Sequence, residues 1–497
     1  MFFNPRSQDF FVDWDRAATD IMLRAEAGTL DPWLHLCNHE PYHTAIGGAT
    51  INRVNNVIGA QLGRTASGLR PNEKGIEMNR LVLTNVNLLD GENPAVRNRT
   101  VVVEGDRITS VGADLATAND GDRVVDLQGR TVMPGMATCH YHSTLPSGDN
   151  GGLAPYGYEF PAPYQALLAH RNLMTALEQG YTIVVGAGSS REIDPGIKKA
   201  IEDGLVLGPR FVPSGRELST TGHANDLTIP WHWGLPELGA ARNCDGAEAF
   251  RYAVRDEVKK GVEVIKLFVT RGHLVKGAND TMEMTRDELG AAIETAHERG
   301  VLVRGHLAGK RAIMMSIELG IDIVDHCDEM DDEVISALAE TGIFVVPSIH
   351  YIKAFLNTEK DSMFTKSSAE ARAESKRNLE FMYDALPKAE AAGVRLLLGD
   401  DYGGLLRHGQ YGEELHTYIE DAGLAPLAVI RWATRNGADV IRRGDDLGTI
   451  EAGKLADLLV IDGDPSDDIR VLADKKPLAV LKGGQIVCGA LPDEHSA

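Results

Sequence analysis

The segment TVMPGMATCHYHSTLP, residues 131–146, ends an apolar run with two histidines that lie one residue apart, His140 and His142. Further short β-branched runs follow it, and segments of helical period that close with glycine or a turn cluster separate them. These runs are YTIVVGAG (181–188), PRFVPSG (209–215), VEVIKLFVT (262–270), VLVRGHL (301–307), IDIVDHC (321–327), IFVVPSIHY (343–351) and VRLLLGDD (394–401). With the first segment they make eight strand–helix units, which predict an α/β protein with a (β/α)8 TIM-type barrel.

The barrel is expected to span residues 135–444, and a different pattern flanks it on both sides. Residues 78–134 and 445–497 contain alternating strands that are punctuated by glycine and Asp-Gly turns. Neither flank by itself makes a convincing domain. We therefore expect the two flanks to combine into one small β-sandwich beside the barrel.

Residues 1–77 belong to neither part and form an N-terminal extension. Within it, residues 4–28 have helical period and resemble a fragment of the C-terminal domain of MmyB-type helix-turn-helix regulators. The rest is polar and rich in glycine, as expected of a linker or a disordered segment. A DNA-binding regulator would need an intact pair of DNA-binding helices, and this segment shows none.

Composition excludes several classes of function. The chain has 72 acidic and 50 basic side chains, and a formal net charge of −22 would repel the phosphate backbone of nucleic acids. No apolar stretch of about 18 residues predicts a membrane span. The five cysteines are scattered and never spaced as C-x-x-C, which argues against a disulfide framework or a thiolate zinc site. We expect a cytoplasmic protein with a small-molecule substrate, assembled as a homo-oligomer.

Candidate metal ligands stand at the ends of several predicted strands. His140 and His142 share one face of their strand, because side chains at i and i+2 point the same way. His306 ends the fifth run, His326 the sixth and Asp400 the eighth, all at the catalytic face of a barrel. This convergence predicts a metal site, with zinc as the default for N and O ligands and cobalt or manganese as alternatives. By strand alternation, Asp401 should face away from the metals.

Lys266 is a charged residue on a strand that is otherwise apolar. It shares a strand face with Val262, Val264 and Phe268, so it points into the barrel if the valines do. A buried unpaired ammonium costs several kcal/mol. Either an Asp or Glu pairs with this lysine for structural reasons, or CO2 carboxylates it and its two new oxygens bridge two metal ions.

Together these motifs resemble the metal-dependent amidohydrolase superfamily, in particular the imidazolonepropionase-like branch that includes Xaa-Pro dipeptidases. The resemblance runs from about residue 79 to 490 and rests on VMPGMATCHYH, the lysine of VIKLF, GHLAG, DHCDE, LLLGDD and GTIEAGKLADLLVIDGDP. It implies two metal ions. The first would be bound by His140, His142 and Asp400 and the second by His306 and His326, with carboxylated Lys266 as the bridge.

Four residues are candidates for the substrate pocket. His223 lies in TTGHAND (220–226), where the family often has TGGHG. Arg271 and His273 lie in VTRGH (269–273), just above the bridging lysine, where many relatives have small residues. Arg271 would either grip a substrate carboxylate or close a salt bridge. Tyr351 in SIHY is a candidate donor to the scissile carbonyl.

The predicted activity is hydrolysis of a C–N bond in a small molecule of the amide, dipeptide, urea or carbamate type. A metal-bridging hydroxide would attack the carbonyl, and Asp400 would move the proton from water to the leaving nitrogen. The alternatives are a hydrolase of cyclic amides or a deaminase of the same fold, often with one metal and no bridging lysine, and a non-catalytic binding protein. Lys266 argues against the first alternative, and the filled ligand positions argue against the second.

Overall fold

The computed structural model describes residues 80–113, 119–146, 157–158, 160–223, 226, 232, 239–272, 280–357 and 369–492. The chain divides into two compact units, Met1–Ile76 and Glu77–Ala497. The first unit lies outside the described residues, and with it the predictions for the N-terminal extension. Among the described helices, none is both long and apolar enough to cross a membrane.

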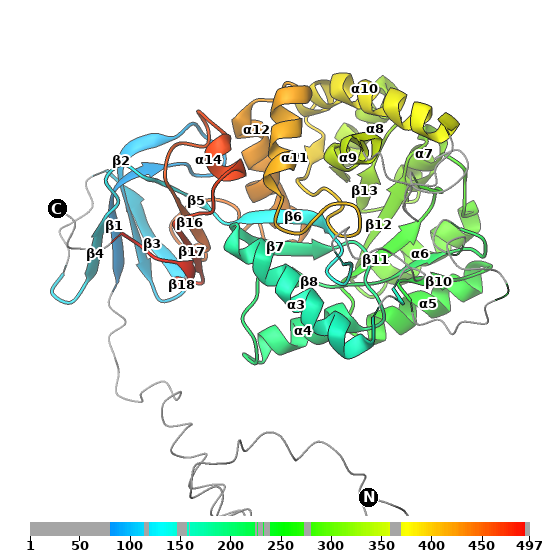
Figure 1. Ribbon diagram of the computed structural model, residues 1–497, viewed down its shortest axis with the longest axis horizontal. Coiled ribbons are helices and arrows are strands. Elements are labelled where there is room, and N and C mark those ends of the chain that lie inside the picture. Colours follow the sequence, from blue (N-terminus) through cyan, green and yellow to red (C-terminus); the bar gives the residue numbers. More distant parts are fainter. Residues whose placement is uncertain are drawn as a thin grey trace, which may run out of the picture. The chain divides into compact units, whose positions relative to one another are not determined.

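Strands from both flanks of the catalytic region pair in one eight-stranded sheet, in which β5 and β16 join the two flanks in antiparallel register with Val132 opposite Val460 (Figure 1). Its strands are β1 (Leu81–Leu88), β2 (Val96–Glu104), β3 (Arg107–Gly112), β4 (Arg123–Asp126), β5 (Thr131–Pro134), β16 (Leu458–Ile461), β17 (Ala479–Lys482) and β18 (Gln485–Gly489). Alternating apolar residues such as Leu83, Val101 and Leu481 are buried in one cluster. The pairing gives one sheet, so a two-sheet sandwich stays a prediction.

The strands between the flanks form two parallel sheets. The first holds β6 (Met136–Tyr141), β7 (Tyr181–Gly186) and β8 (Arg210–Val212). The second runs in the order β10 (Ala241–Asn243), β9 (Ser214–Ser219), β11 (Val264–Phe268), β12 (Leu302–Leu307), β13 (Ile323–His326), β14 (Phe344–Val346) and β15 (Arg395–Leu396).

Backbone contacts connect the two parallel sheets at both edges. Only Pro213 separates β8 from β9, so the predicted third strand is divided there, because proline cannot donate to the ladder. At the other edge, the amide of Cys139 in β6 donates to the carbonyl of Leu398 at 2.7 Å. The amide of His142 donates to the carbonyl of Tyr402 at 2.9 Å. The carboxyl ends of β6 and of the segment after β15 therefore lie side by side.

Helices alternate with the parallel strands and cover them (Figure 1). They are α3 (Ala162–Glu178), α4 (Ile193–Glu202), α5 (Ala247–Lys259), α6 (Arg286–His297), α7 (Lys310–Glu318), α8 (Asp332–Thr341), α9 (Ile349–Asn357), α10 (Ala369–Ala391), α11 (Gly412–His416), α12 (Pro426–Arg431) and α13 (Gly437–Val440), with π-helical turns η2 (Thr417–Asp421) and η3 (Trp432–Asn436). The short helix α14 (Arg470–Ala473) lies between β16 and β17 of the eight-stranded sheet. The helical segment at residues 285–300 is α6 in the structure, and Thr285 and Glu288 form a reciprocal capping box at its start.

The eighth predicted strand is shorter than its sequence pattern indicates. The apolar run 394–401 predicts a strand through Asp401, but β15 ends at Leu396. Beyond it the backbone turns at Gly399, with φ of +157°, and at Asp401, with φ of +60°. Strand alternation cannot be extended past that point.

Candidate metal centre

His140 and His142 stand at the carboxyl end of β6, and neighbouring groups fix the orientation of both rings. His140 Nδ1 lies 3.2 Å from the hydroxyl of Ser348, which donates to the carbonyl of Gly399 and so accepts from the ring. His142 Nδ1 lies 3.0 Å from the carbonyl oxygen of Gly188, which can only accept. In the neutral form of each ring, Nδ1 therefore carries the proton, and Nε2 is the nitrogen that would bind a metal.

Both Nε2 atoms point at the carboxylate of Asp401. Its Oδ1 lies 2.8 Å from His142 Nε2 and 3.4 Å from His140 Nε2. Burial by itself would lower the pKa of His142, but the hydrogen bond and charge of Asp401 raise it above its usual value. Burial, together with the charges of Lys266 and Arg304, lowers the pKa of His140 well below its usual value, which favours the neutral imidazole.

The position of Asp401 corrects the arrangement that strand alternation predicted. Asp400 was expected to face the histidines and Asp401 to face away, and the structure has the opposite arrangement. The physical reason is that β15 has already ended, and the positive φ of Asp401 rotates its side chain toward β6. The aspartate of this cluster is therefore Asp401.

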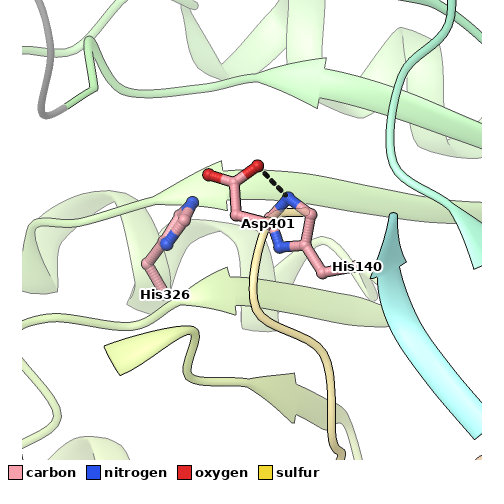
Figure 2. A group of neighbouring side chains, drawn as sticks. All are labelled: His140, His326 and Asp401. Carbon is pink, nitrogen blue, oxygen red and sulfur yellow. Dashed lines mark ion pairs between the residues drawn. The ribbon is translucent and has the colours of Figure 1, made fainter. Parts of the chain in front are cut away.

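His326 completes a group of three candidate ligands. It ends β13 with φ of +69°, and its ring centroid lies 5.2 Å from that of His140. One ligand atom each from His140, His326 and Asp401 lies within 4.8 Å of the others (Figure 2). Two imidazoles and a carboxylate at this separation fit a divalent ion such as zinc, which prefers N and O ligands at about 2 Å.

His306 on β12 lies next to this group. Its ring packs against that of His326, with centroids 4.4 Å apart, and stacks on the ring of Phe268 at 4.7 Å with an interplanar angle of 6°. The structure thus gathers the four histidines that the sequence singled out, from three different strands.

Lys266 on β11 is buried, with 1% of its side chain exposed, and it forms an ion pair. Its Nζ lies 2.5 Å from Oδ2 of Asp325, and Asp325 is also bound by the guanidinium of Arg304. Burial alone would raise the pKa of Asp325, but Arg304 and then Lys266 hold it well below its usual value. Of the two sequence-based alternatives for Lys266, the acidic partner is present in the structure. Carboxylation stays a prediction.

Asp400 lies apart from the histidines, in a buried acidic pair. None of its surface is exposed, and its Oδ1 accepts from the amide of Tyr351 at 3.3 Å. Burial and then the charge of Glu414 raise the pKa of Asp400 well above its usual value. Glu414 accepts from the amide of Gly399 at 2.6 Å, and burial raises its own pKa to about 8. These two carboxyl groups support the loop that carries Asp401.

The predicted substrate residues have different surroundings. His223 is buried with its ring 6.1 Å from that of Phe268, and burial lowers its pKa to about 4. Arg271 Nε donates to Glu283 at 2.6 Å, so the expected salt bridge is present. Tyr351, on α9, keeps its proton because burial, followed by the charges of Asp401 and Glu217, raises its pKa well above the usual value. His273 lies outside the described residues.

Several residues near the centre were missed from the sequence. Ser348 and Gly188 orient the histidines, and no sequence pattern marks such contacts, since they join distant segments. Arg304 and Asp325 had a usable signal, because each is a charge inside an apolar strand, as Lys266 is. The backbone of Gly272 also approaches His306, since a Cβ added there would lie 3.3 Å from Nε2.

Comparison with known proteins shows the family of the chain. The model of the amidohydrolase family matches residues 131–487, which is more than half of the chain. The chain belongs to the amidohydrolase family. Ochratoxinase from Aspergillus niger is 29% identical over 433 residues, which cover 81% of this chain and 85% of that protein.

Solved structures of amidohydrolases are similar over most of their length. A Xaa-Pro dipeptidase with methionine bound in its active site gives a TM-score of 0.73 at 27% identity, covering 82% of this chain and 99% of the other. A prolidase complexed with N-methylphosphonate-L-proline gives 0.73 at 30% identity with the same coverage. This amidohydrolase is therefore a hydrolase of C–N bonds of the amide type, and its relatives imply the (β/α)8 barrel.

Proposed function

We propose that this amidohydrolase is a metal-dependent enzyme that cleaves an amide-type bond in a small molecule that carries a free carboxylate. The observation that supports metal dependence is the convergence of His140, His326 and Asp401 within 4.8 Å, with His142 against the same aspartate. The imidazoles of His140 and His142 are already oriented by hydrogen-bond partners at Nδ1, as is usual for histidines that bind a metal through Nε2.

His140, His142 and Asp401 would hold one divalent ion, and His306 and His326 with a carboxylated Lys266 would hold a second. When bound, the metals would polarise the substrate carbonyl and lower the pKa of a bound water toward neutrality. Zinc suits this donor set, and cobalt and manganese are alternatives.

The chain's own side chains then handle the proton and the substrate. The side chain of Asp401 is 15% exposed, and its Oδ1 contacts His140 and His142. Its carboxylate can therefore take the proton of the attacking water and pass it to the leaving nitrogen. Tyr351 retains its hydroxyl proton and can donate a hydrogen bond to the carbonyl oxygen. Arg271 donates a hydrogen bond from Nε to Glu283. The other N–H groups of its guanidinium can donate to a carboxylate of the substrate.

The relatives support this choice of substrate. Ochratoxinase, a Xaa-Pro dipeptidase and a prolidase bound to a phosphonate of L-proline are among the similar proteins. A screen of metal-loaded protein should therefore begin with Xaa-Pro dipeptides and N-acyl amino acids, each beside its carboxamide analogue, and continue with phenylureas and thiocarbamates. We expect turnover of acids but not of their carboxamides, loss of turnover with chelator, and a raised KM in Arg271→Met. Turnover that survives complete metal removal would refute the proposal.

One observation favours a second candidate, a mononuclear hydrolase of cyclic amides. Lys266 is paired with Asp325, and a lysine kept as an ammonium cannot bridge two metals. Elemental analysis decides between the two candidates, because the mononuclear enzyme would hold one metal per chain whatever the supply of bicarbonate.

A further inference from the structure

Arg304 makes a set of contacts across the interior directly beneath the metal ligands. It is fully buried on β12, two residues before His306. Its Nη1 donates to the carbonyl of Cys139 at 2.7 Å and to that of Gly186 at 3.0 Å. Its Nε donates to Asp325 Oδ2 at 3.1 Å, and its Nη2 donates to Oδ1 of the same carboxylate. One guanidinium thus connects β6, β7, β12 and β13.

Asp325 has two cationic partners, and only one of them is fixed. Arg304 grips both of its oxygens and is itself held by two backbone carbonyls. Lys266 reaches only Oδ2, through a flexible four-carbon stem. If Lys266 moved away, Asp325 would still be paired, and so it would not become an isolated buried charge.

We propose that Asp325 is a positioning residue that neutralises and holds the ammonium of Lys266 until metals bind. It is the counter-ion of Lys266 in the metal-free protein, and Arg304 remains its bidentate cationic partner when metals bind. This inference rests on the proposed function. It explains how Lys266 can be buried before metals bind without being an unpaired charge.

The exchange balances chemically. The ammonium of Lys266 loses one proton to solvent, the amine nitrogen forms a bond to the carbon of CO2, and a second proton leaves the nitrogen. The product is an anionic carbamate, which the metals bind and which Asp325 repels. The Asp325–Arg304 pair remains neutral overall, so the change of charge at Lys266 does not disturb the strands below.

The test compares thermal unfolding of the metal-free and the metal-loaded full chain in the wild type and in Asp325→Asn. The asparagine keeps the shape and an oxygen for Arg304 but removes the charge that holds the lysine. It should destabilise the metal-free form more than the loaded form, so the rise in Tm on metal addition becomes larger than in the wild type. By linkage, half-occupancy should need at least about tenfold less zinc. An unchanged or smaller rise would overturn the proposal.

Glu257→Gln is the matched control. Glu257, on α5, is 1% exposed and pairs with Arg216 on β9, with Nη2 to Oε1 at 2.9 Å, and also with Lys260 at 3.0 Å. Neither α5 nor β9 carries a proposed ligand. The loss of this carboxylate should lower the Tm of both forms alike and leave the rise on metal addition unchanged. A merely structural role of Asp325 predicts the same behaviour for Asp325→Asn.

A measurement on the wild type keeps the proposal testable if Asp325→Asn does not fold. Protein loaded with zinc in 13C-bicarbonate should show a carbamate carbon resonance that is absent in Lys266→Met. Chelation should remove this resonance while the protein stays folded. The inference is contradicted if the chelated protein unfolds or keeps the resonance, or if an active hydrolase never shows the resonance. The proposed function itself is contradicted if the metal-loaded protein hydrolyses nothing in the screen.

Discussion

Asp400 and Asp401 are adjacent, and the structure gives them different surroundings, so mutation can separate their effects. Asp401 Oδ1 lies 2.8 Å from His142 Nε2, and its side chain is 15% exposed, so it can meet both metal and substrate. Asp400 is fully buried and makes its hydrogen bond to the amide of Tyr351. Each is to be replaced by asparagine, which is nearly isosteric but cannot accept a proton at neutral pH.

The expected effects differ by orders of magnitude. Asp401→Asn should lower kcat roughly hundred- to ten-thousandfold, as is typical of lost general acid–base catalysis. That range corresponds to about 3 to 5 kcal/mol of transition-state stabilisation. Burial and then the charge of Glu414 raise the pKa of Asp400, which favours the protonated carboxyl, and the neutral side chain of asparagine resembles that form. Asp400→Asn should therefore change kcat less than about tenfold, or about 1.4 kcal/mol.

The assay measures kcat with the best substrate of the screen, together with metal content by elemental analysis and Tm for both variants. Metal content should fall in Asp401→Asn and remain at the wild-type level in Asp400→Asn. If Asp400→Asn lost activity a hundredfold while Asp401→Asn kept most of it, the assignment of Asp401 to the metal centre would be wrong. If neither variant lost activity while hydrolysis persisted, another residue would carry the proton.

Four further outcomes are expected. Lys266→Ala should lower metal content sharply, and two metals per chain in both variant and wild type would contradict a bridging role. Ser348→Ala frees the Nδ1 of His140 and should weaken zinc binding by about ten- to a hundredfold, as measured by chelator competition. Burial raises the pKa of Glu414 from 4.5 to about 8, so its ionisation lowers the free energy of unfolding increasingly as pH rises from 4.5 to 8. Measured by denaturant unfolding, Glu414→Gln should therefore be more stable than the wild type by up to about 3 kcal/mol at pH 7 and equally stable at pH 4. Deletion of residues 1–75 should leave metal content and turnover nearly unchanged, and loss of either would show that the extension is needed.

Local patterns in the sequence were enough for much of the catalytic region. Alternation of β-branched runs with helical segments predicted the parallel strands, and a capping pattern predicted the start of α6, which the structure has at Arg286. The two histidines of CHYH share a strand end for the same reason, since a period of two residues is a property of the strand itself. The buried position of Lys266 also followed from its apolar neighbours.

The contacts between distant segments were decided by the tertiary structure. Asp325 and Arg304 are inside apolar strands, yet nothing in the sequence says that they pair with each other and with Lys266. The same holds for Ser348, which follows β14 and lies 3.2 Å from Nδ1 of His140 on β6. Such pairings depend on how strands that are far apart in the chain are placed side by side.

The choice between Asp400 and Asp401 shows where sequence reasoning stops. The run 394–401 determined that an aspartate would stand near the carboxyl end of the eighth strand. Which one faces the histidines depends on Gly399, whose backbone packs so closely on β6 that an added Cβ would lie 2.4 Å from the amide nitrogen of His140. Gly399 has a φ of +157°, and β15 has already ended at Leu396, so strand alternation does not reach the aspartates. A period of two residues is a local property of an extended chain, whereas the point at which the chain leaves that conformation is set by the strand against which it packs.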